Sequence, residues 1–535
     1  MKKYFLIIFA AITLTGCLSE DPKGQVRDED AYTSAADVEH NLVANLYNYI
    51  GGKSNSQGLQ GTTRGVYDFN SMTTDEQILP VRGGDWYDGG FWQRLYFHKW
   101  TATETPLFDT WNYLYKVVML CNQSIEKIDE HKSLLSTSEH AALLSEVRAI
   151  RALFYWELMD MYGRVPLVTK TNSKVSEVTQ SERSEVYHFI IDELQQSLPY
   201  LSQERSNWQG SYYGRITRPV AQFLLAKLAL NAEIYSDDNW TDESYPSGKE
   251  IFFEVNGKKL NAWQTVIAYC DELAAEGYQL EENAAFNFSI NNETSKENIF
   301  VIPMDKVLYA NQYGYLFRSR HYSHGSALGL DSENGTSATL STVKSFGYGT
   351  KNVDTRYAWT FFSDTIKVNG NVVKLDNGKP LVYEPLAILP DVSGTSYEKT
   401  AGARVHKYEV DTKAYADGHL QDNDIVLFRY ADVLLMKAEA QVRNGEDGSA
   451  ALNAVRNRAG MPSRDATLDN ILEERLLELM WEGWRRNDLI RFHRFTTAYD
   501  QRPQLEEEKD HHTMVFPIPQ QSIDLNGNLK QNKGY

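Results

Sequence analysis

Apolar side chains recur at every third or fourth position over long stretches of the chain, which is the spacing of one face of an α-helix. Helix boundary signals accompany this pattern. Ser136 and Glu139 form a capping box, Gly163 stands at a helix end, and Pro219 lies in a first turn. The pattern predicts helices over residues 36–50, 105–128, 139–162, 186–201, 216–235 and 263–276.

The pattern returns near the C-terminus, where tight turns at Asn444-Gly445 and Gly460 separate apolar faces. Helix, glycine turn, helix is the unit from which helical repeats are stacked. Three helices are predicted here: 427–442, 449–459, and a third that carries Leu472, Leu476, Leu479 and Gly483 on one face.

Helical periodicity fades between residues 283 and 424, where Gly, Ser, Asn and Tyr become frequent. Asn-Gly pairs at 256–257, just before this region, and at 369–370, within it, are flanked by strand-like runs, which is the signal of a β-hairpin. The prediction is a mainly α fold. It has a helical scaffold over 31–282, a loop-rich, partly β-hairpin insert over 283–424, and a C-terminal helical segment over 425–535.

The N-terminus has the form of a lipoprotein signal. Lys2 and Lys3 precede an apolar run over 5–14 that is too short to span a bilayer, and Leu14-Thr15-Gly16-Cys17 matches a lipoprotein cleavage box. We predict a signal peptide over 1–16, acylation of Cys17, and a polar tether over 17–30. The alternative is a plain secretory signal followed by a coincidental cysteine.

Charge and cysteine content exclude some classes of function. The net charge is −18, and an acidic chain lacks the basic face that nucleic acid binding needs. No Cys/His cluster has metal-ligand spacing, so no cofactor is predicted, although Asp422-Asn423-Asp424 has the oxygen chemistry to hold Ca²⁺. Cys121 and Cys270 fall in helical patterns and are predicted to be buried thiols, with a disulfide between them as the alternative.

Acidic residues on the last helical stretch raise the question of catalysis. A glycoside hydrolase needs two carboxyl groups facing one bond, one protonated and one ionised. No nucleophile is paired with a base in the sequence, and no phosphate-cradling glycine loop is present, so catalysis is not predicted. The acidic residues of this stretch are instead predicted to form an ion network with nearby arginines, including a pair between Glu482 and Arg486. They are Glu473, Glu474, Glu478 and Glu482.

Two structural roles are also predicted. Arg151 is predicted to form a buried ion pair, and Trp481 and Trp484, three apart on the helix, to lie in the core.

Aromatic side chains in polar, glycine-rich loops suggest a binding site instead. A sugar presents apolar C–H faces that flat rings can cover, and hydroxyl groups that planar polar side chains can hold. The loop over 75–92 has this chemistry, and its glycines leave its rings little local core. The alternative for each ring is packing between insert and scaffold. The predicted ligand-binding residues are Asp75, Arg82, Asp85, Trp86, Tyr87 and Trp92 in this loop, Tyr313 and Tyr322 in a second cluster that includes Tyr309 and Arg320, and Arg404 in a third.

Several long strings resemble one known family. FRYADVLLMKAEA, LNAVRNRAG, EERLLELMWEGWRRNDLIRF and RALFYWELMDMYGRVPLV are similar to the scaffold motifs of the SusD/RagB family of surface lipoproteins. The resemblance extends from the lipobox to Tyr535, and it implies a tetratricopeptide-like helical-repeat scaffold. The matching motifs carry no ligand residues, so the candidate site rests on local chemistry alone.

The resemblance also implies a role. Members of the family are non-enzymatic and lie on the outer face of the outer membrane, where they cover a SusC-like TonB-dependent barrel and capture glycans or, less often, peptides. The expected function is therefore that of a lipid-anchored protein that delivers an oligosaccharide or polysaccharide to such a transporter. The alternatives are a RagB-like peptide-binding lipoprotein and a secreted glycoside hydrolase.

Overall fold

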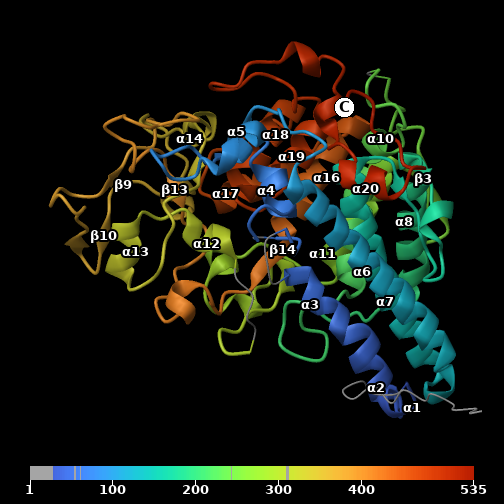
Figure 1. Cartoon of the computed structure of the whole chain (residues 1–535). Coiled ribbons are helices and arrows are strands. Elements are labelled where there is room, and N and C mark those ends of the chain that lie inside the picture. Colours follow the sequence, from blue (N-terminus) through green and yellow to red (C-terminus); the bar gives the residue numbers. More distant parts are fainter. Residues whose placement is uncertain (1–27, 53–55, 61, 243, 309–312) are drawn as a thin grey trace, which may run out of the picture.

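The computed structural model describes residues 28–52, 56–60, 62–242, 244–308 and 313–535. The predicted signal peptide, Cys17 and most of the tether lie outside the described residues, as does Tyr309. Helix α1 (Asp28–Ala31) lies at one end of the molecule and the C-terminus at the other, and the insert projects from one side of the scaffold (Figure 1).

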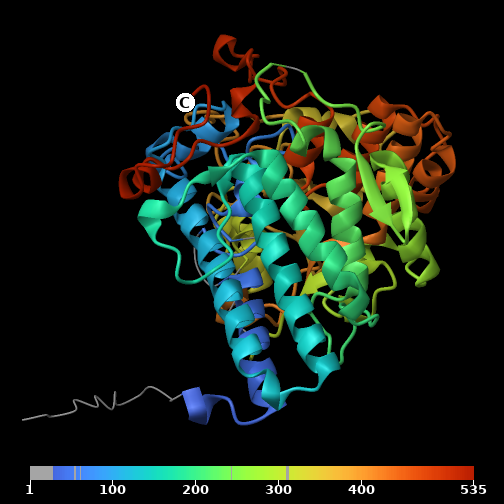
Figure 2. The ribbon, with the colours of Figure 1, turned by 90° about the vertical axis from the view of Figure 1, so that its right-hand side faces the viewer.

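The scaffold is built from helices that pack in pairs along the chain. Helix α6 (Thr105–Glu130) lies beside α7 (Thr137–Tyr162), and α7 lies beside α8 (Arg183–Ser197), so the three form a layer (Figure 2). Helix α9 (Arg218–Leu230) packs on α11 (Ala262–Ala275), α11 on α16 (Tyr430–Asn444), and α16 on α17 (Ser449–Arg458) and α18 (Leu468–Leu479).

The boundary signals in the sequence explain where the long scaffold helices begin and end. Ser136 accepts a hydrogen bond from the backbone of Glu139, whose side chain accepts one from Ser136, as the capping box predicts. Gly163 ends α7 with φ +70°, and a Cβ there would lie 2.8 Å from the ring of Trp240.

Shorter helices complete the helical part of the fold. Besides short 3-10 turns, they are α2 (Ala35–Glu39), a π-helix (His40–Ala44), α3 (Asn45–Gly51), α4 (Val66–Ser71), α5 (Phe91–Tyr96), α10 (Ala232–Tyr235), α12 (Gly314–Arg318), α13 (Tyr322–Leu328), α14 (Leu340–Ser345), α15 (Tyr357–Thr360), α19 (Arg485–Arg491) and α20 (Gln520–Leu525).

Small two-stranded antiparallel sheets provide the β-structure of the described chain. Both Asn-Gly pairs form the predicted hairpins: β4 (Phe252–Val255) with β5 (Lys258–Asn261), and β10 (Lys367–Val368) with β11 (Asn371–Val372). The other pairs are β1 (Gln77–Ile78) with β7 (Ser337–Ala338), β2 (Val165–Pro166) with β3 (Gln180–Ser181), β8 (Phe361–Phe362) with β13 (Arg404–Val405), β9 (Asp364–Thr365) with β12 (Val382–Tyr383), and β6 (Asn298–Ile302) with β14 (Ile425–Arg429).

The β6–β14 pair corrects the predicted start of the C-terminal helix. Leu427 lies in strand β14, and α16 begins only at Tyr430. The five residues of β14 are all buried, and the first four, Ile425 to Phe428, form a continuous apolar run in which strand and helix periodicities cannot be told apart. The pairing joins the two ends of the predicted insert, and Ile299, Phe300 and Ile302 of β6 belong to the main scaffold core.

A second correction concerns the third C-terminal helix. Helix α18 ends at Leu479, and the backbone of Trp481 and Gly483 adopts positive φ angles of 68° and 76° before α19 begins. Gly483 and the two tryptophans therefore do not lie on that helix, although Trp481 and Trp484 are buried in the core as predicted. The strain at Trp481 is compensated by long-range contacts that no local pattern contains.

Three of the four predicted network carboxylates, Glu474, Glu478 and Glu482, lie in the interior, whereas Glu473 pairs with Arg464 in a partly exposed position outside the network. Glu478 Oε1 is 2.7 Å from Arg429 Nη1, and Glu478 Oε2 is 2.9 Å from Arg356 Nη1, with all three side chains almost fully buried. Glu482 joins the network through Arg429 and Lys407 rather than through Arg486, which pairs with Asp160. The predicted pair between Glu482 and Arg486 is thus wrong, because the two residues do not share a helix.

Two other sequence predictions are confirmed. Arg151 is buried in α7 and donates to Glu193 Oε2 at 2.6 and 2.9 Å. Cys121 and Cys270 are both buried free thiols. These features belong to the packing of the scaffold.

Candidate functional site

A tight turn over residues 82–90 presents the aromatic loop at the surface. The backbone N–H of Arg82 donates to Asp85 O at 3.0 Å, and that of Asp85 donates back to Arg82 O at 3.3 Å. Trp86 and Asp88 then adopt positive φ angles of 64° and 44° before α5 begins. Backbone strain of this kind is held by surrounding contacts, and it gathers at functional sites.

Two tyrosines from distant parts of the sequence are exposed near this turn. Tyr87 is 60% exposed and Tyr322, at the start of α13, is 46% exposed. The Tyr322 hydroxyl lies 3.3 Å from Asp85 Oδ2, and Lys399 Nζ lies 2.9 Å from the same oxygen. We call Asp85, Trp86, Tyr87, Tyr322 and Lys399 the aromatic surface.

Trp86 is held firmly at the base of this surface. Its indole N–H donates to Glu333 O at 2.9 Å, and its ring meets the buried ring of Trp92 edge-on at 6.3 Å between centroids. A Cβ on Gly335 would lie 3.0 Å from the Trp86 ring, so the ring needs a glycine at this position. Trp92 itself donates to Asp88 Oδ2 at 2.7 Å.

The remaining predicted ligand residues are buried or paired within the fold. Arg82 and Arg404 are fully buried and Tyr313 lies in the main core, while Asp75 forms a bidentate pair with Arg485 at 2.6 and 2.7 Å. Of the nine predicted side chains, the structure brings Asp85 and Tyr322 into contact, and Trp86 and Tyr87 follow Asp85 in the same turn; Arg82, Arg404 and Trp92 lie behind them.

Sequence reasoning missed Lys399, which closes one side of the aromatic surface. Its Nζ lies 2.9 Å from both Asp85 Oδ2 and Arg82 O, across more than 300 positions of sequence. No local signal marks it, because it stands in an ordinary polar stretch of the insert. Gly335 and Glu333 were also missed, for the same reason.

Three histidines lie close behind the aromatic surface. Burial, followed by the neighbouring arginines, lowers the pKa of His321 to about 4 and of His324 to about 3, and burial lowers that of His406 to about 4. All three are therefore neutral near pH 7. Within the described part of the chain, no group of three or more His, Cys, Asp or Glu side chains could hold a metal ion.

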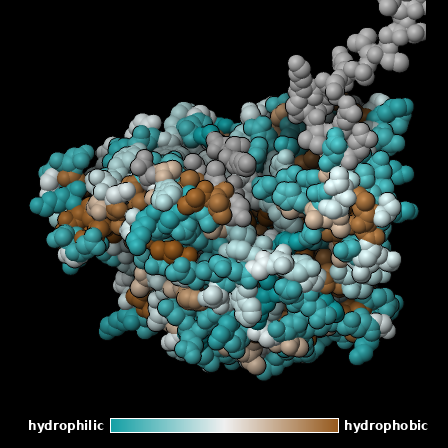
Figure 3. All heavy atoms as spheres, turned by 90° about the horizontal axis from the view of Figure 1, so that it is seen from below, coloured by the Kyte–Doolittle hydropathy of each residue, from teal (hydrophilic) through white to brown (hydrophobic). Residues whose placement is uncertain are grey.

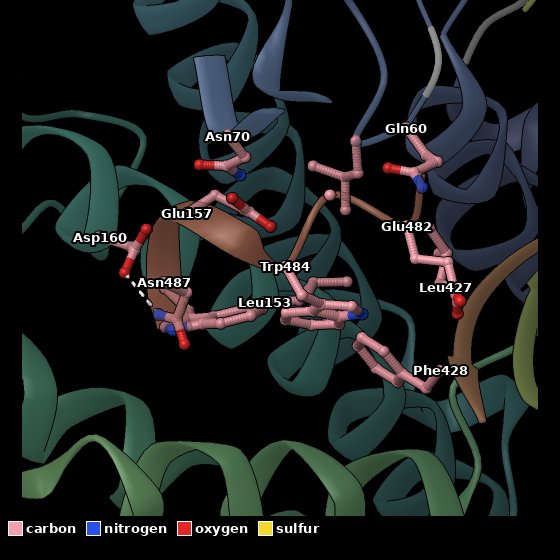
Figure 4. Close-up of a pocket in the computed structure, with 13 residues that line it drawn as sticks. Gln60, Asn70, Leu153, Glu157, Asp160, Leu427, Phe428, Glu482, Trp484 and Asn487 are labelled. Carbon is pink, nitrogen blue, oxygen red and sulfur yellow. Dashed lines mark hydrogen bonds between the residues drawn. The ribbon is translucent and has the colours of Figure 1, made fainter. Parts of the chain in front are cut away.

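A small cavity lies elsewhere, between α7, β14 and the segment that precedes α19 (Figure 4). Its volume is about 40 Å³, and Glu157, Asn70, Gln60 and Trp484 are among its lining residues. Burial and the nearby Asp160 raise the pKa of Glu157 to about 8, so this carboxyl is protonated near neutral pH. The cavity has room for a few water molecules but not for a sugar ring, so it is not a candidate ligand site.

Comparison with known proteins agrees with the sequence motifs. A profile described as the SusD family matches residues 277–535. A second, described as starch-binding associating with outer membrane, matches residues 38–230. The chain belongs to the SusD/RagB family. Within the described residues, no helix of this SusD/RagB chain is long and apolar enough to cross a membrane.

Individual relatives of this SusD/RagB protein are distant but similar in length. It is 25% identical to the starch-binding protein SusD of Bacteroides thetaiotaomicron, over 73% of its own length and 72% of that protein. It is 23% identical to SusD-like protein P38 of Formosa agariphila, over the whole of both chains.

Solved structures share the fold of this family member. A SusD-like protein from Bacteroides fragilis has a TM-score of 0.71 at 20% identity, covering 95% of this chain and 99% of that one. Surface glycan-binding protein A from Bacteroides thetaiotaomicron, solved in complex with laminarihexaose, has a TM-score of 0.69 at 19% identity, covering 94% and 100%. The mainly helical SusD-like fold with small two-stranded sheets is thereby established.

Proposed function

We propose that this SusD/RagB protein is a non-enzymatic surface lipoprotein that binds a glycan and delivers it to a SusC-like TonB-dependent outer-membrane transporter. Its anchor is the acyl group on Cys17, which places the protein on the outer face of the outer membrane. The helical scaffold, paired in the manner of tetratricopeptide repeats, serves as a rigid mount for the loops that contact the glycan.

The observation that carries the proposal is the exposure of Tyr322 beside the Asp85–Lys399 pair, with a second exposed ring, Tyr87, two positions after Asp85 in the same turn. Exposed rings offer flat apolar faces for sugar C–H groups, and the paired carboxylate and ammonium offer hydrogen bonds to hydroxyls. The names of relatives support the ligand class, since one is a starch-binding protein and another was solved with laminarihexaose. A shallow surface of this kind gives modest affinity, because it buries little apolar area.

The proposal is tested by calorimetry or affinity electrophoresis of the acylation-free mature protein against a panel of neutral and acidic polysaccharides. Tyr87→Ala, Tyr322→Ala and Trp86→Ala should each weaken binding to the glycan that the wild type retains. Tyr200→Ala is the matched control, because Tyr200 is a 56% exposed tyrosine on the scaffold, outside the aromatic surface.

Other outcomes would favour the alternatives. Binding of a peptide but of no glycan would support the RagB-like role, and release of reducing sugar from a bound glycan would support a hydrolase. Retention of full glycan affinity by all three aromatic variants would place the site away from the aromatic surface and leave the family role untouched.

A further inference from the structure

Three buried arginines behind the aromatic surface have no carboxylate partner. Arg82, Arg320 and Arg404 are at most 4% exposed, and none of them forms an ion pair among the described residues. Each of the other buried arginines in the described chain lies within 4 Å of an Asp or Glu oxygen: Arg151, Arg183, Arg318, Arg356, Arg429, Arg456, Arg475, Arg485, Arg486, Arg491 and Arg502.

Two of the three are satisfied only by neutral oxygens. Arg82 Nη1 donates to Glu398 O at 3.1 Å, and its Nη2 donates to Ser337 Oγ at 2.8 Å and to Gly335 O and Ala401 O at 3.1 and 3.0 Å. Arg404 Nη1 donates to Ser319 O at 2.7 Å and to Asn334 Oδ1 at 2.9 Å. These contacts satisfy the donors but bring no negative charge.

Arg320 is the least satisfied of the three. It is 4% exposed, and its buried Nε and Nη2 atoms donate no hydrogen bond to any described residue. A buried cation without a partner is costly, and it persists where something else compensates the charge. The guanidinium stays charged at neutral pH even though burial lowers its pKa to about 10.

The three arginines form one cluster around Tyr383, just behind Tyr322. The Arg404 guanidinium carbon lies 4.8 Å from the centre of the Tyr383 ring, whose hydroxyl accepts the His321 N–H at 2.8 Å and lies 3.2 Å from His324 Nδ1. His321 connects Arg320 to Tyr322 along the chain. The histidines of the cluster are neutral, so its charge comes from the arginines.

The acidic groups nearest to the cluster lie at its margin. Asp85 faces Arg82 but already pairs with Lys399, and Asp331 faces Arg320 but lies 3.1 Å from His419 and is half-exposed. Asp376 faces His321, and Glu333, whose pKa is raised by burial, lies beside Tyr322. Exposed carboxylates are screened by water, whereas the buried arginines are screened far less.

We propose that the aromatic surface is built for an anionic glycan, whose carboxylate or sulfate groups supply the counter-charge that the three arginines lack. This inference rests on the proposed glycan-binding function and names the class of glycan. The chain as a whole has a net charge of −18 and repels such a ligand, so a local positive potential is needed where it binds.

The test uses polygalacturonate and alginate as uronic acid probes, chondroitin sulfate and carrageenan as sulfated probes, and laminarin and amylopectin as neutral probes. We expect tightest binding within an acidic class, weakening as NaCl is raised. Arg320→Gln should lower acidic affinity by roughly tenfold, whereas Arg320→Lys should retain most of it. The control is Arg464→Gln, which removes a partly exposed arginine paired with Glu473 on the scaffold.

A second readout separates ligand binding from a structural role. Because Arg320 is an unpaired buried cation, Arg320→Gln should raise the melting temperature of the free protein while it weakens acidic binding. A variant that lost stability and kept its affinity for acidic glycans would overturn the inference. So would tight binding of a neutral glycan that Tyr322→Ala abolishes and Arg320→Gln leaves unchanged, although the proposed function would then stand. Failure to bind any of the six probes would count against both proposals.

Discussion

The side chain of Glu76 accepts a hydrogen bond of 2.9 Å from the backbone N–H of Trp481, 405 positions further along the chain. Beside it, Asp75 pairs with Arg485, and the Tyr67 hydroxyl donates to Trp481 O at 3.4 Å. These contacts hold Trp481 in its left-handed conformation and join the segment over 67–76 to the turn between α18 and α19.

Glu76 gives the protein a pH dependence of known sign. Burial raises its pKa to about 8, whereas an unfolded glutamate ionises near pH 4.5. Between these values the folded state holds a proton that the unfolded state has lost. The free energy of unfolding therefore falls as pH rises, by roughly 1.4 kcal/mol per pH unit for this one group.

We expect Glu76→Gln, which keeps the acceptor for Trp481, to remove that dependence and to exceed the wild type in stability by a margin that grows between pH 5 and 8. Urea unfolding at several pH values measures it. The control is Glu473→Gln, which changes a partly exposed carboxylate. Parallel stability curves for the wild type and Glu76→Gln would show that Glu76 is not protonated in the folded state.

The buried ion network should be intolerant of losing one charge. Glu478→Gln leaves Arg356, Arg429 and Arg458 with less counter-charge in the interior, and we expect a loss of about 3–5 kcal/mol of stability. Glu473→Gln, in the partly exposed pair with Arg464, should cost less than about 1 kcal/mol. Denaturant midpoints of the two variants test the difference, and equal midpoints would contradict it.

Lowering the pH should remove the stabilisation that the ionised Glu439 side chain provides. Burial alone would raise its pKa, but the guanidinium groups of Arg491 and Arg443 bring it down to about 2. A carboxylate with a depressed pKa stabilises the fold above the unfolded value near 4.5, and this contribution is lost as pH falls towards 2. We expect the pair with Arg491 to account for ~3 kcal/mol over that range. Circular dichroism during acid titration should show Glu439→Gln less stable than the wild type at pH 6 and equal to it near pH 2.

Gly335 should control the position of Trp86. An alanine Cβ there would lie 3.0 Å from the Trp86 ring and from Arg318 Cγ, so the ring must shift or the backbone must move. We expect Gly335→Ala to cost about 1–3 kcal/mol and to weaken glycan binding. Gly84→Ala is the matched control in the same loop, because no atom lies within 4 Å of its Cβ position. Thermal unfolding and affinity electrophoresis of both variants would decide whether the Trp86 ring is held as tightly as the contacts indicate.

The sequence predicted the scaffold better than the site, for physical reasons. Helix α7 carries its own capping box and a repeating apolar face, so local chemistry determines it. Strand β14 is buried on both faces and owes its strand form to β6, more than 120 positions away. The break at Trp481 likewise depends on Glu76, which no local pattern contains.

The prediction of the candidate site was partly wrong for the same reason. Loop composition marked Arg82 and Tyr87 as equals, yet Arg82 is buried by backbone oxygens 253–319 positions away, and Tyr87 is exposed. Exposure of a loop side chain depends on which distant segment folds over it. The types of side chain on the aromatic surface could therefore be predicted from the sequence, but which individual residues are exposed there could not.

The long reach of the Glu76–Trp481 contact has a consequence for the order in which the protein can form during biosynthesis. Helices α6 to α9 can pair with their neighbours as soon as they emerge, since their contacts are close in sequence. The segment around Glu76 cannot, and α7 itself meets Phe516 through the Phe516 N–H bond of 2.7 Å to Met161 O. The interior can therefore be completed only after the last part of the chain has been synthesised.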